Sequence, residues 1–596
     1  MKELEYPLDS GYIMKKRKAL KRRLLSSGEE RIHKRIAVLG GSTTADIVSV
    51  LEIFLLDSGI EPEFYQCGYA QYRNEALFPS KELEEFAPDI VYLHTSRRNL
   101  GFVPSPKMTE EQISGGLAEE VAGFERLWDS LAEKFRCPII QNNFEQPYYR
   151  LLGNSDFSDH RGQVNFTMRM NLAFAERAQR REDLYINDIN WLSAACGLEK
   201  WSAPEYWYMY KYSLNVSCIP ELCLQLAAII RSVFGRNKKA VALDLDNTLW
   251  GGIVGDDGAE DLVIGQESAD AMAFYEWQSY LRSLKDIGVL LTVCSKNDEE
   301  NALAGLNHPE GALRPEDFTV IKANWLPKDK NISDMAEEIG ILPEAFVFAD
   351  DNPAERELVR AQLAGVRVPE LTEVTDYIRI LDRSEYFEVT SLSEDDLNRS
   401  EMYKANAQRK ILRAGFESYG DYLKSLEMRG EIRPFSPAYI RRIAQLTNKS
   451  NQFNLTSVRY TPAQIEEISK SDRYVHLYGR LSDKFGDNGV VSVIIGETDA
   501  EDPKMLDILL WLMSCRVLKR DMELAMLDGL VKAARERGFE KLTGIYIPTS
   551  KNKMVSELYP GTLGFSPVPS RIDGADMWEL DIRKYENKNT VIEIAY

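Results

Sequence analysis

The chain has 596 residues, a formal net charge of −20 and 44% hydrophobic residues. This length predicts about three domains, and the acidic balance argues against a general nucleic-acid binder. Seven scattered cysteines without a CxxC motif indicate reduced thiols rather than a disulfide framework. The start lacks a signal-peptide pattern, and no apolar run reaches the ~18 residues that span a bilayer. We therefore expect a cytoplasmic protein without a membrane segment.

The first predicted domain covers residues 1–236. A short strand at 35–39 runs into Gly40-Gly41-Ser42-Thr43-Thr44 and then into an apolar-periodic helix. Glycines and free amides at such a turn favour anions or oxyanions. This segment resembles the first block of the SGNH hydrolase fold, with Ser42 at the position of the nucleophile.

SGNH hydrolases end with an Asp-x-x-His pair that activates the serine. The matching place here reads Asp188-Ile189-Asn190-Trp191, and an indole cannot abstract a proton. The resemblance therefore implies an SGNH-like, flavodoxin-like domain that is not catalytic, although the sequence leaves the activity of Ser42 open.

The second predicted domain, residues 237–385, contains the strongest chemical pattern. The apolar run 241–243 is typical of a buried parallel strand, and such strands deliver polar residues to the carboxyl edge of an α/β sheet. Polar side chains that suit phosphate chemistry then follow four elements in turn: Asp244, Asp246 and Thr248; Cys294, Ser295 and Asn297; Lys328; Asp350, Asp351 and Asn352. Buried carboxylates need compensation, and Mg²⁺ held by carboxylates and phosphate oxygens supplies it.

This order of motifs resembles the haloacid dehalogenase superfamily of phosphotransferases. The resemblance implies that Asp244 is the phosphoryl-accepting nucleophile, Asp246 the general acid/base and Lys328 the group that neutralises phosphoryl charge. It implies that substrate is held by Thr248, Ser295, Asn297 and Asn352. It implies a Mg²⁺ site made by Asp244, Asp350, Asp351 and the backbone carbonyl of Asp246. The short stretch between the first two strands leaves room for a flap and one helix, so we expect a Rossmann-like core without a large cap.

The strings DLDNTLWGGIVGDDG, CSKN and DDNPAERELVR resemble the FkbH-like family, subfamily IIIC of that superfamily. Its described members take glyceryl from 1,3-bisphosphoglycerate and load it on an acyl carrier protein for polyketide biosynthesis. The resemblance implies the same enzyme activity here, a glyceryl transferase and phosphatase that acts through an enzyme thioester. Nearby positive charge lowers a thiol pKa, so Cys294 is the first candidate for the thiol and Cys515 the rival. Two alternatives stay open: a phosphatase or acyl-transfer enzyme of polysaccharide tailoring, and a non-catalytic scaffold that docks carrier proteins.

The third predicted domain covers residues 386–596. Alternating apolar strands and helices that lead to Leu563-Gly564-Phe565 resemble the α+β fold of GNAT acyltransferases. The turn expected to bind a CoA pyrophosphate has Lys519 and Asp521 where glycines let amides approach phosphate. CoA and a phosphopantetheine arm on a carrier protein therefore remain alternative ligands.

Overall fold

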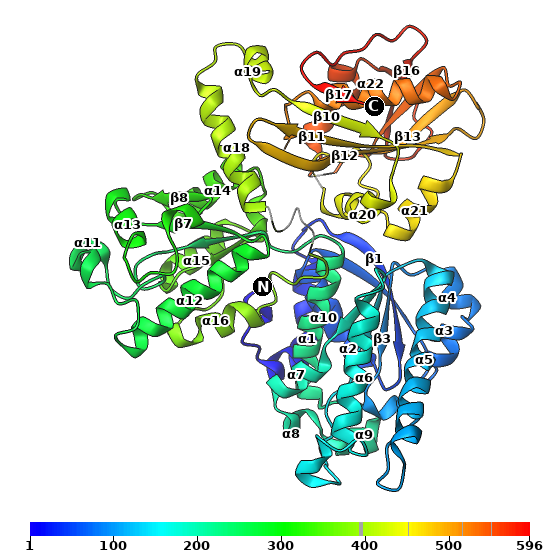
Figure 1. Ribbon diagram of the computed structural model, residues 1–596, viewed down its shortest axis with the longest axis vertical. Helices are drawn as coiled ribbons and strands as arrows, with labels where there is room; N and C mark the ends of the chain where they lie inside the picture. The colour runs from blue at the N-terminus through cyan, green and yellow to red at the C-terminus, as the bar shows by residue number, and fades with distance from the viewer. Residues whose placement is uncertain (393–396, 398, 451, 515–516, 550) are drawn as a thin grey trace. The chain divides into compact units, whose positions relative to one another are not determined.

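The computed structural model describes residues 1–392, 397, 399–450, 452–514, 517–549 and 551–596 (Figure 1). The chain divides into two compact units, residues 1–236 with 388–390 and residues 237–387 with 391–596. Within the described ranges, three sheets with covering helices form the fold. The predicted multidomain α/β class is confirmed, and the division into three domains stays a prediction.

The first unit is built on a parallel sheet with the order β2-β1-β3-β4-β5, which is the flavodoxin-like order. Its strands are β1 (Ile32–Gly40), β2 (Ile60–Gln66), β3 (Ile90–His94), β4 (Ile139–Asn142) and β5 (Leu184–Asn187). Its main helices are α1 (Ser10–Leu25), α2 (Ala45–Asp57), α3 (Tyr72–Leu77), α4 (Lys81–Phe86), α5 (Glu110–Phe135), α6 (Gln163–Ala178), α7 (Ile189–Cys196), α8 (Leu198–Trp201), α9 (Pro204–Tyr210) and α10 (Ile219–Val233).

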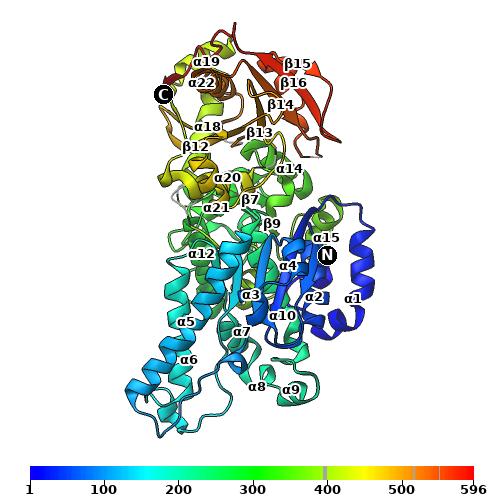
Figure 2. The same cartoon turned by 90° about the vertical axis from the view of Figure 1, so that its right-hand side faces the viewer.

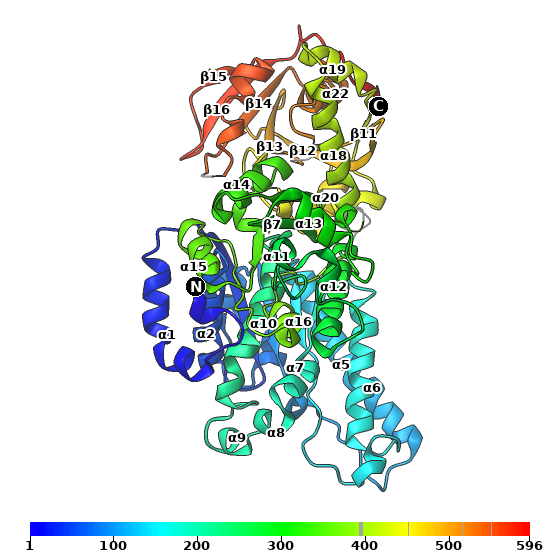
Figure 3. The same cartoon turned by 90° about the vertical axis from the view of Figure 1, so that its left-hand side faces the viewer.

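Strand alternation divides the core of this unit into two layers. Ile36 and Val38 of β1 pack with α1, α2 and α10, whereas Ala37 and Leu39 pack with α5 and α6. Figures 2 and 3 show α1 and α2 side by side. The segment Val216–Val233 is long and apolar enough to cross a membrane, but 72% of it is buried inside the protein. Its apolar character is therefore explained by its position as the central core helix of this unit.

The second unit begins with a parallel sheet of order β8-β7-β6-β9. Its strands are β6 (Ala240–Leu243), β7 (Leu290–Ser295), β8 (Val320–Ala323) and β9 (Phe346–Ala349). Its helices are α11 (Val254–Asp257), α12 (Ala269–Asp286), α13 (Glu299–Leu306), α14 (Lys328–Ile339), α15 (Pro353–Gln362) and α16 (Val374–Arg383). The one-turn α11 and the helix α12 fill the connection from β6 to β7, so no large cap is inserted there.

The two faces of this central sheet are covered by different helices. Val241 and Leu243 of β6 pack toward α12 and α16, which lie side by side in Figure 3. Ala240 and Ala242 pack toward α14. Because both faces are covered, the polar residues that follow the strands are confined to the sheet edge.

The second unit continues into a mixed sheet of order β15-β16-β14-β13-β12-β11-β10-β17. Its strands are β10 (Arg429–Arg433), β11 (Tyr474–Asp483), β12 (Gly486–Thr498), β13 (Met505–Met513), β14 (Lys541–Tyr546), β15 (Ser566–Val568), β16 (Asp576–Asp581) and β17 (Glu593–Ala595). Its helices are α18 (Arg399–Ala414), α19 (Tyr419–Ser425), α20 (Ile440–Lys449), α21 (Pro462–Lys470) and α22 (Met522–Glu536).

The turn before α22 keeps the backbone conformation that glycine favours, although it contains no glycine. The φ angles of Lys519 and Asp521 are 61° and 59°. Both residues therefore place a side chain where a glycine would leave the backbone open to phosphate. The neighbouring Cys515 and Arg516 lie outside the described residues.

Candidate active site

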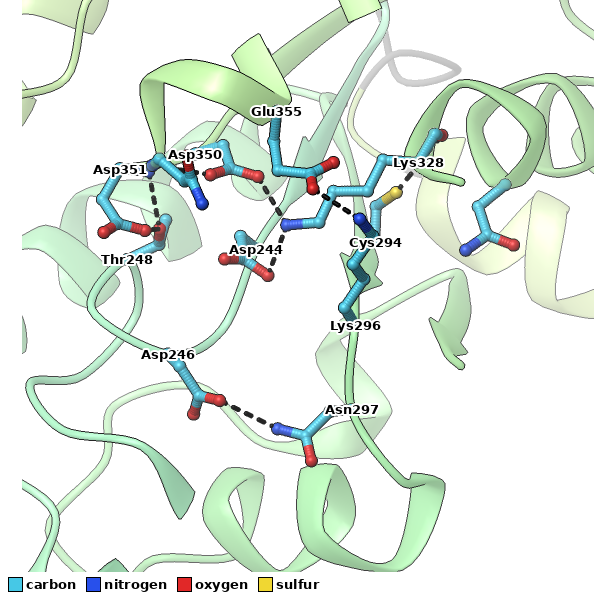
Figure 4. Close-up of polar contacts among 12 residues, drawn as sticks. Asp244, Asp246, Thr248, Cys294, Lys296, Asn297, Lys328, Asp350, Asp351 and Glu355 are labelled. Atoms are coloured by element: carbon cyan, nitrogen blue, oxygen red, sulfur yellow. Dashed lines mark hydrogen bonds and ion pairs between the residues drawn. The ribbon is translucent and has the colours of Figure 1, made fainter. Parts of the chain in front are cut away.

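Two adjacent strands bring three aspartates together at the carboxyl edge of the central sheet (Figure 4). Asp244 follows β6, and its backbone N–H donates to the carbonyl of Ala349 at the end of β9 (3.0 Å). Asp350 and Asp351 follow β9 directly. One carboxylate oxygen from each of the three aspartates lies within 4.8 Å of the others. Such clustered, hard oxygen donors are the ligand type that Mg²⁺ prefers.

Lys328 connects two of these aspartates. It is the first residue of α14, it is 2% exposed, and its Nζ lies 2.9 Å from Oδ1 of Asp244 and 2.5 Å from Oδ2 of Asp350. Burial opposes the ammonium form, but the two carboxylates outweigh burial and raise the pKa of Lys328 above its usual range. Burial and the charge of Asp244 raise the pKa of Asp350 to about 6, although Lys328 opposes this rise. Negative charge thus exceeds positive charge in this buried cluster.

Thr248 ties the turn after β6 to the second acidic pair. Its hydroxyl donates to Oδ1 of Asp351 (3.1 Å) and accepts the backbone N–H of the same residue (3.1 Å). The Thr248 side chain is fully buried. Burial and the nearby Asp244 raise the pKa of Asp351. The hydroxyl predicted to hold substrate therefore also positions the Asp351 carboxylate.

The Asp246 carboxylate lies apart from the cluster of three aspartates (Figure 4). Its Oδ1 accepts hydrogen bonds from Nε1 of Trp250 (3.0 Å) and the backbone N–H of Val254 (3.1 Å). Its Oδ2 accepts from Nδ2 of Asn297 (3.0 Å). Burial raises the pKa of Asp246, which favours a carboxyl group that carries a proton. Asn297, predicted to bind substrate, is thus a positioning contact for Asp246.

The other predicted substrate ligands differ in their surroundings. Ser295 is 2% exposed at the end of β7. Asn352 is exposed, and its side-chain oxygen accepts the backbone N–H of Ala354 (2.9 Å), so it caps α15. Lys296 forms an ion pair with Glu355 (2.5 Å) at the same sheet edge. A substrate role for Ser295 and Asn352 stays a prediction.

Cys294, the first candidate for the reactive thiol, lies in the protein core. The side chain is 0% exposed and packs in the hydrophobic layer beneath the sheet. Its sulfur contacts the backbone carbonyl of Lys328 (3.6 Å) rather than the cluster of aspartates. Burial raises the pKa of the thiol strongly, and the ammonium of Lys328 is too small an influence to reverse this. Strand alternation directs Cys294 to the core, and this burial opposes the thiolate form that a nucleophile requires. The role of Cys294 as the reactive thiol stays a prediction.

Sequence reasoning missed Arg356, which is 4% exposed in the first turns of α15. Its Nη1 donates to the backbone carbonyls of Asp350 (2.8 Å), Asp351 (2.6 Å) and Leu371 (3.0 Å). The guanidinium therefore holds the loop that carries the acidic pair. An arginine on the apolar face of the helix after the motif was the available signal, since buried arginines are rare without partners.

One family model matches the first part of the chain. Residues 35–231 match the family model described as FkbH, N-terminal domain. The predicted resemblance to the FkbH family is confirmed by this match. No curated protein matches the chain.

Solved structures are similar to two parts of this FkbH-like chain. The N-terminal part of BF1531 from Bacteroides fragilis, which contains a phosphatase domain complexed with Mg, is 26% identical with a TM-score of 0.57. The match covers 63% of this chain and 99% of that fragment. The ribosomal-protein-S18-alanine N-acetyltransferase from Escherichia coli is 13% identical, with a TM-score of 0.20 over 27% of this chain and 99% of its own. The GNAT domain of PAT from S. lividans is 14% identical, with a TM-score of 0.21 over 25% of this chain and 89% of its own.

Proposed function

We propose that the FkbH-like chain is a magnesium-dependent phosphatase of the haloacid dehalogenase type. The observation that carries this proposal is Asp244, which lies 2.9 Å from Lys328 and shares a cluster of carboxylates with Asp350 and Asp351. A nucleophile, a neutralising ammonium and a set of hard ligands are the parts that phosphoryl transfer requires. The similar B. fragilis fragment, a phosphatase domain complexed with Mg, supports both the reaction and the metal.

The metal would be held by Asp244, Asp350 and Asp351, with the backbone carbonyl of Asp246 as a further proposed ligand. These residues fit Mg²⁺ because they offer oxygen atoms alone and because the cluster carries excess negative charge. When bound, Mg²⁺ supplies charge neutralisation at the phosphoryl oxygens.

The side chains of this chain would perform the proton and phosphoryl steps. A carboxylate oxygen of Asp244 attacks phosphorus, the bond from phosphorus to the leaving oxygen breaks, and the carboxyl group of Asp246 gives that oxygen its proton. Water then attacks the phosphorus of the phosphoaspartate, loses a proton to Asp246, and phosphate leaves. Lys328 offsets the charge of the transferred group, and the hydroxyls of Thr248 and Ser295 would hold its oxygens.

Phosphate release tests this proposal directly. The full chain with Mg²⁺ should hydrolyse small phosphate esters and acyl phosphates, and an acid-quenched reaction should contain phosphate bound to Asp244. Asp244→Asn should abolish both signals, whereas Asp256→Asn, at an exposed acid of the flap, should abolish neither. Turnover that survives Asp244→Asn would refute the assignment.

The finer proposal concerns the substrate and the acceptor. We propose that the substrate is 1,3-bisphosphoglycerate and the acceptor is the phosphopantetheine thiol of an acyl carrier protein. The supporting finding is the match of residues 35–231 to the FkbH N-terminal domain. Since Cys294 is buried, we propose that the carrier thiolate attacks the acyl carbon directly. A carbon–sulfur bond forms, the bond from the acyl carbon to the phosphate oxygen breaks, and phosphate leaves with the electron pair.

Direct transfer gives Asp244 a separate task, which is removal of the remaining phosphate ester. The rival thiol Cys515 lies outside the described residues, and its part in the reaction stays a prediction. A chain with Cys294→Ala should therefore load the carrier as well as the unchanged chain does. If Cys294→Ala loses loading but keeps its melting temperature, direct transfer is refuted and an enzyme thioester at Cys294 is supported instead.

Intact mass of a carrier protein incubated with the chain, Mg²⁺ and 1,3-bisphosphoglycerate separates the candidate functions. Added glyceryl supports the transferase. Phosphate release without a change in carrier mass supports the phosphatase and refutes the transferase. Binding of the carrier with neither product supports the docking scaffold and refutes both enzyme proposals.

A further inference from the structure

Trp325 and Leu326 lie in the loop between β8 and α14, shortly before Lys328. Their exposures are 70% and 52%, so most of each apolar side chain meets water although Lys328 itself is buried. Adjacent apolar side chains that remain exposed beside a functional site are typical of a recognition surface. We call Trp325 and Leu326 the apolar rim.

Hydrogen bonds anchor the loop that carries the apolar rim. The backbone N–H of Asn324 donates to the carbonyl of Ser295 at the end of β7 (3.1 Å). Oδ1 of Asn324 accepts the backbone N–H of Leu326 (3.0 Å) and Nδ2 of Asn331 (2.9 Å), and Asn331 is 1% exposed. The backbone therefore holds the two apolar side chains in water from a fixed position.

Three hydrogen bonds in series connect the indole to the general acid of the proposed reaction. Nε1 of Trp325 donates to Oδ1 of Asp298 (3.0 Å). The backbone N–H of Asp298 donates to Oδ1 of Asn297 (2.9 Å), and Nδ2 of Asn297 donates to Oδ2 of Asp246 (3.0 Å) (Figure 4). In the proposed reaction Asp246 gives its proton to the leaving oxygen. This series of contacts places the apolar rim on the side of the site where the leaving group extends.

The chemistry of the rim indicates a leaving group with apolar parts. The leaving group of a free glycerate phosphate is short, and its hydroxyl and carboxylate groups lose favourable hydration against an indole. The phosphopantetheine arm of the proposed carrier is long and has methyl and methylene groups between its amides. A glyceryl thioester joins this arm to the phosphate ester. The connection from β6 to β7 inserts no large cap that would exclude such an arm.

We propose that Trp325 and Leu326 bind the pantetheine arm, and that Asp244 removes the phosphate after the acyl group has been loaded on the carrier. This inference rests on the proposed function and adds an order of steps to it. The carrier thiolate first displaces the acyl phosphate and forms a phosphoglyceryl thioester.

The second step then takes place on the loaded arm. A carboxylate oxygen of Asp244 attacks the remaining phosphorus, the bond from phosphorus to the glyceryl oxygen breaks, and Asp246 gives that oxygen a proton. Water attacks the phosphoaspartate, returns a proton to Asp246 and releases phosphate. The carbon–sulfur bond stays intact, so glyceryl remains on the carrier.

Two thioesters of 3-phosphoglycerate test the apolar rim. One carries pantetheine and the other a methyl group, so the two substrates differ only in the arm. With the full chain and Mg²⁺, phosphate release from the pantetheine thioester should have the higher kcat/KM. Trp325→Ala should lower the ratio of the two kcat/KM values by about 10-fold, mainly through KM, which is the effect of one well-placed aromatic contact.

Two further variants serve as controls for the indole. Trp325→Phe keeps an aromatic ring and should retain most of the ratio. Tyr275→Ala removes an exposed aromatic side chain of α12 and should leave the ratio unchanged, because α12 covers a face of the sheet rather than its carboxyl edge. Equal losses on both thioesters in Trp325→Ala would show a merely structural role and would overturn the assignment of the rim.

Intact mass of the carrier tests the order of steps. The unchanged chain with Mg²⁺ should convert a carrier that was loaded chemically with phosphoglyceryl into the glyceryl carrier, and failure to do so would overturn the order. Asp244→Asn cannot take up the phosphoryl group, so with 1,3-bisphosphoglycerate it should leave phosphoglyceryl on the carrier. Equal kcat/KM of the unchanged chain on both thioesters would overturn the inference but support the phosphatase. Release of phosphate from neither thioester nor p-nitrophenyl phosphate would refute the phosphatase itself.

Discussion

Nζ of Lys328 lies 2.5 Å from Oδ2 of Asp350, and the two side chains are 3% and 0% exposed. A buried ion pair compensates its own desolvation only while both partners are present. Here one ammonium faces Asp350 and Asp244 together, so a second positive charge is needed for balance. We therefore expect the stability of the central sheet edge to depend on metal binding.

Lys328→Met should destabilise the chain most when Mg²⁺ is absent. Removal of the ammonium leaves Asp350 buried without its partner, which costs about 3–5 kcal/mol. Urea unfolding in EDTA and in Mg²⁺ measures this cost, and Mg²⁺ should recover part of it. Lys322→Met, which breaks the more exposed pair between Lys322 of β8 and Glu338 of α14, should change stability little. An equal loss with and without Mg²⁺ would contradict the coupling.

Magnesium itself should stabilise the protein through Asp351. At about 100 times its dissociation constant, a ligand that binds only the folded state adds about 2.7 kcal/mol to the free energy of unfolding. Asp351→Asn removes one charged ligand, so the rise in melting temperature on adding Mg²⁺ should shrink or vanish. Asp334→Asn changes an exposed acid of α14 and should leave the full rise. A rise of equal size in Asp351→Asn would remove this residue from the metal site.

The strand ends of the central domain could be located from sequence because apolar runs followed by acids specify parallel strands and their carboxyl edge. Asp244, Lys328 and Asp350 accordingly meet in one cluster. The sequence does not show, however, to which side of the sheet a side chain at the strand end points. Cys294 and Ser295 are adjacent, and only the packing of the sheet decides which one enters the core.

Contacts between distant segments were also beyond sequence reasoning. His94 and Ser213 are 119 positions apart, and neither belongs to a recognisable motif. Their proximity depends on the path of the chain after α9, which returns to the Ser42 turn. Arg356 was hidden for a similar reason, since its partners are backbone carbonyls and the side chain of Glu370, which lies 14 positions further along the chain.

Asn297→Ala should impair protonation of the leaving group by Asp246 more than nucleophilic attack by Asp244. Its amide donates to Oδ2 of Asp246 at 3.0 Å, and its loss frees the carboxyl group from one of its positioning contacts. Alkyl phosphates need a proton on the leaving oxygen, so their hydrolysis should slow by about 10- to 100-fold, within the range of general-acid effects. Hydrolysis of p-nitrophenyl phosphate should change much less, because p-nitrophenolate leaves unprotonated. Asn307→Ala, at an exposed residue of the same region, should affect neither substrate, and an equal loss on both substrates would show a merely structural role.

Asp483→Asn should destabilise the C-terminal sheet strongly. Asp483 ends β11 with a fully buried side chain, and it accepts hydrogen bonds from Arg409 (2.7 Å) and Arg520 (3.0 Å). Burial and the charge of Arg409 lower the pKa of Arg520 to about 10, whereas the charge of Asp483 raises it.

The neutral amide of Asp483→Asn would remove the negative charge that Asp483 presents to the two buried arginines, at a cost of about 3–5 kcal/mol. Hydrogen exchange of the β11 and β12 amides in the full chain measures this cost locally, and exchange should accelerate there while the amides of β6 and β9 stay protected. Asp487→Asn is the matched control in the same hairpin, because its pair with Arg480 is exposed and contributes about 0–1 kcal/mol. Equal exchange rates in the two variants would mean that the charge of Asp483 does not determine the stability of the sheet.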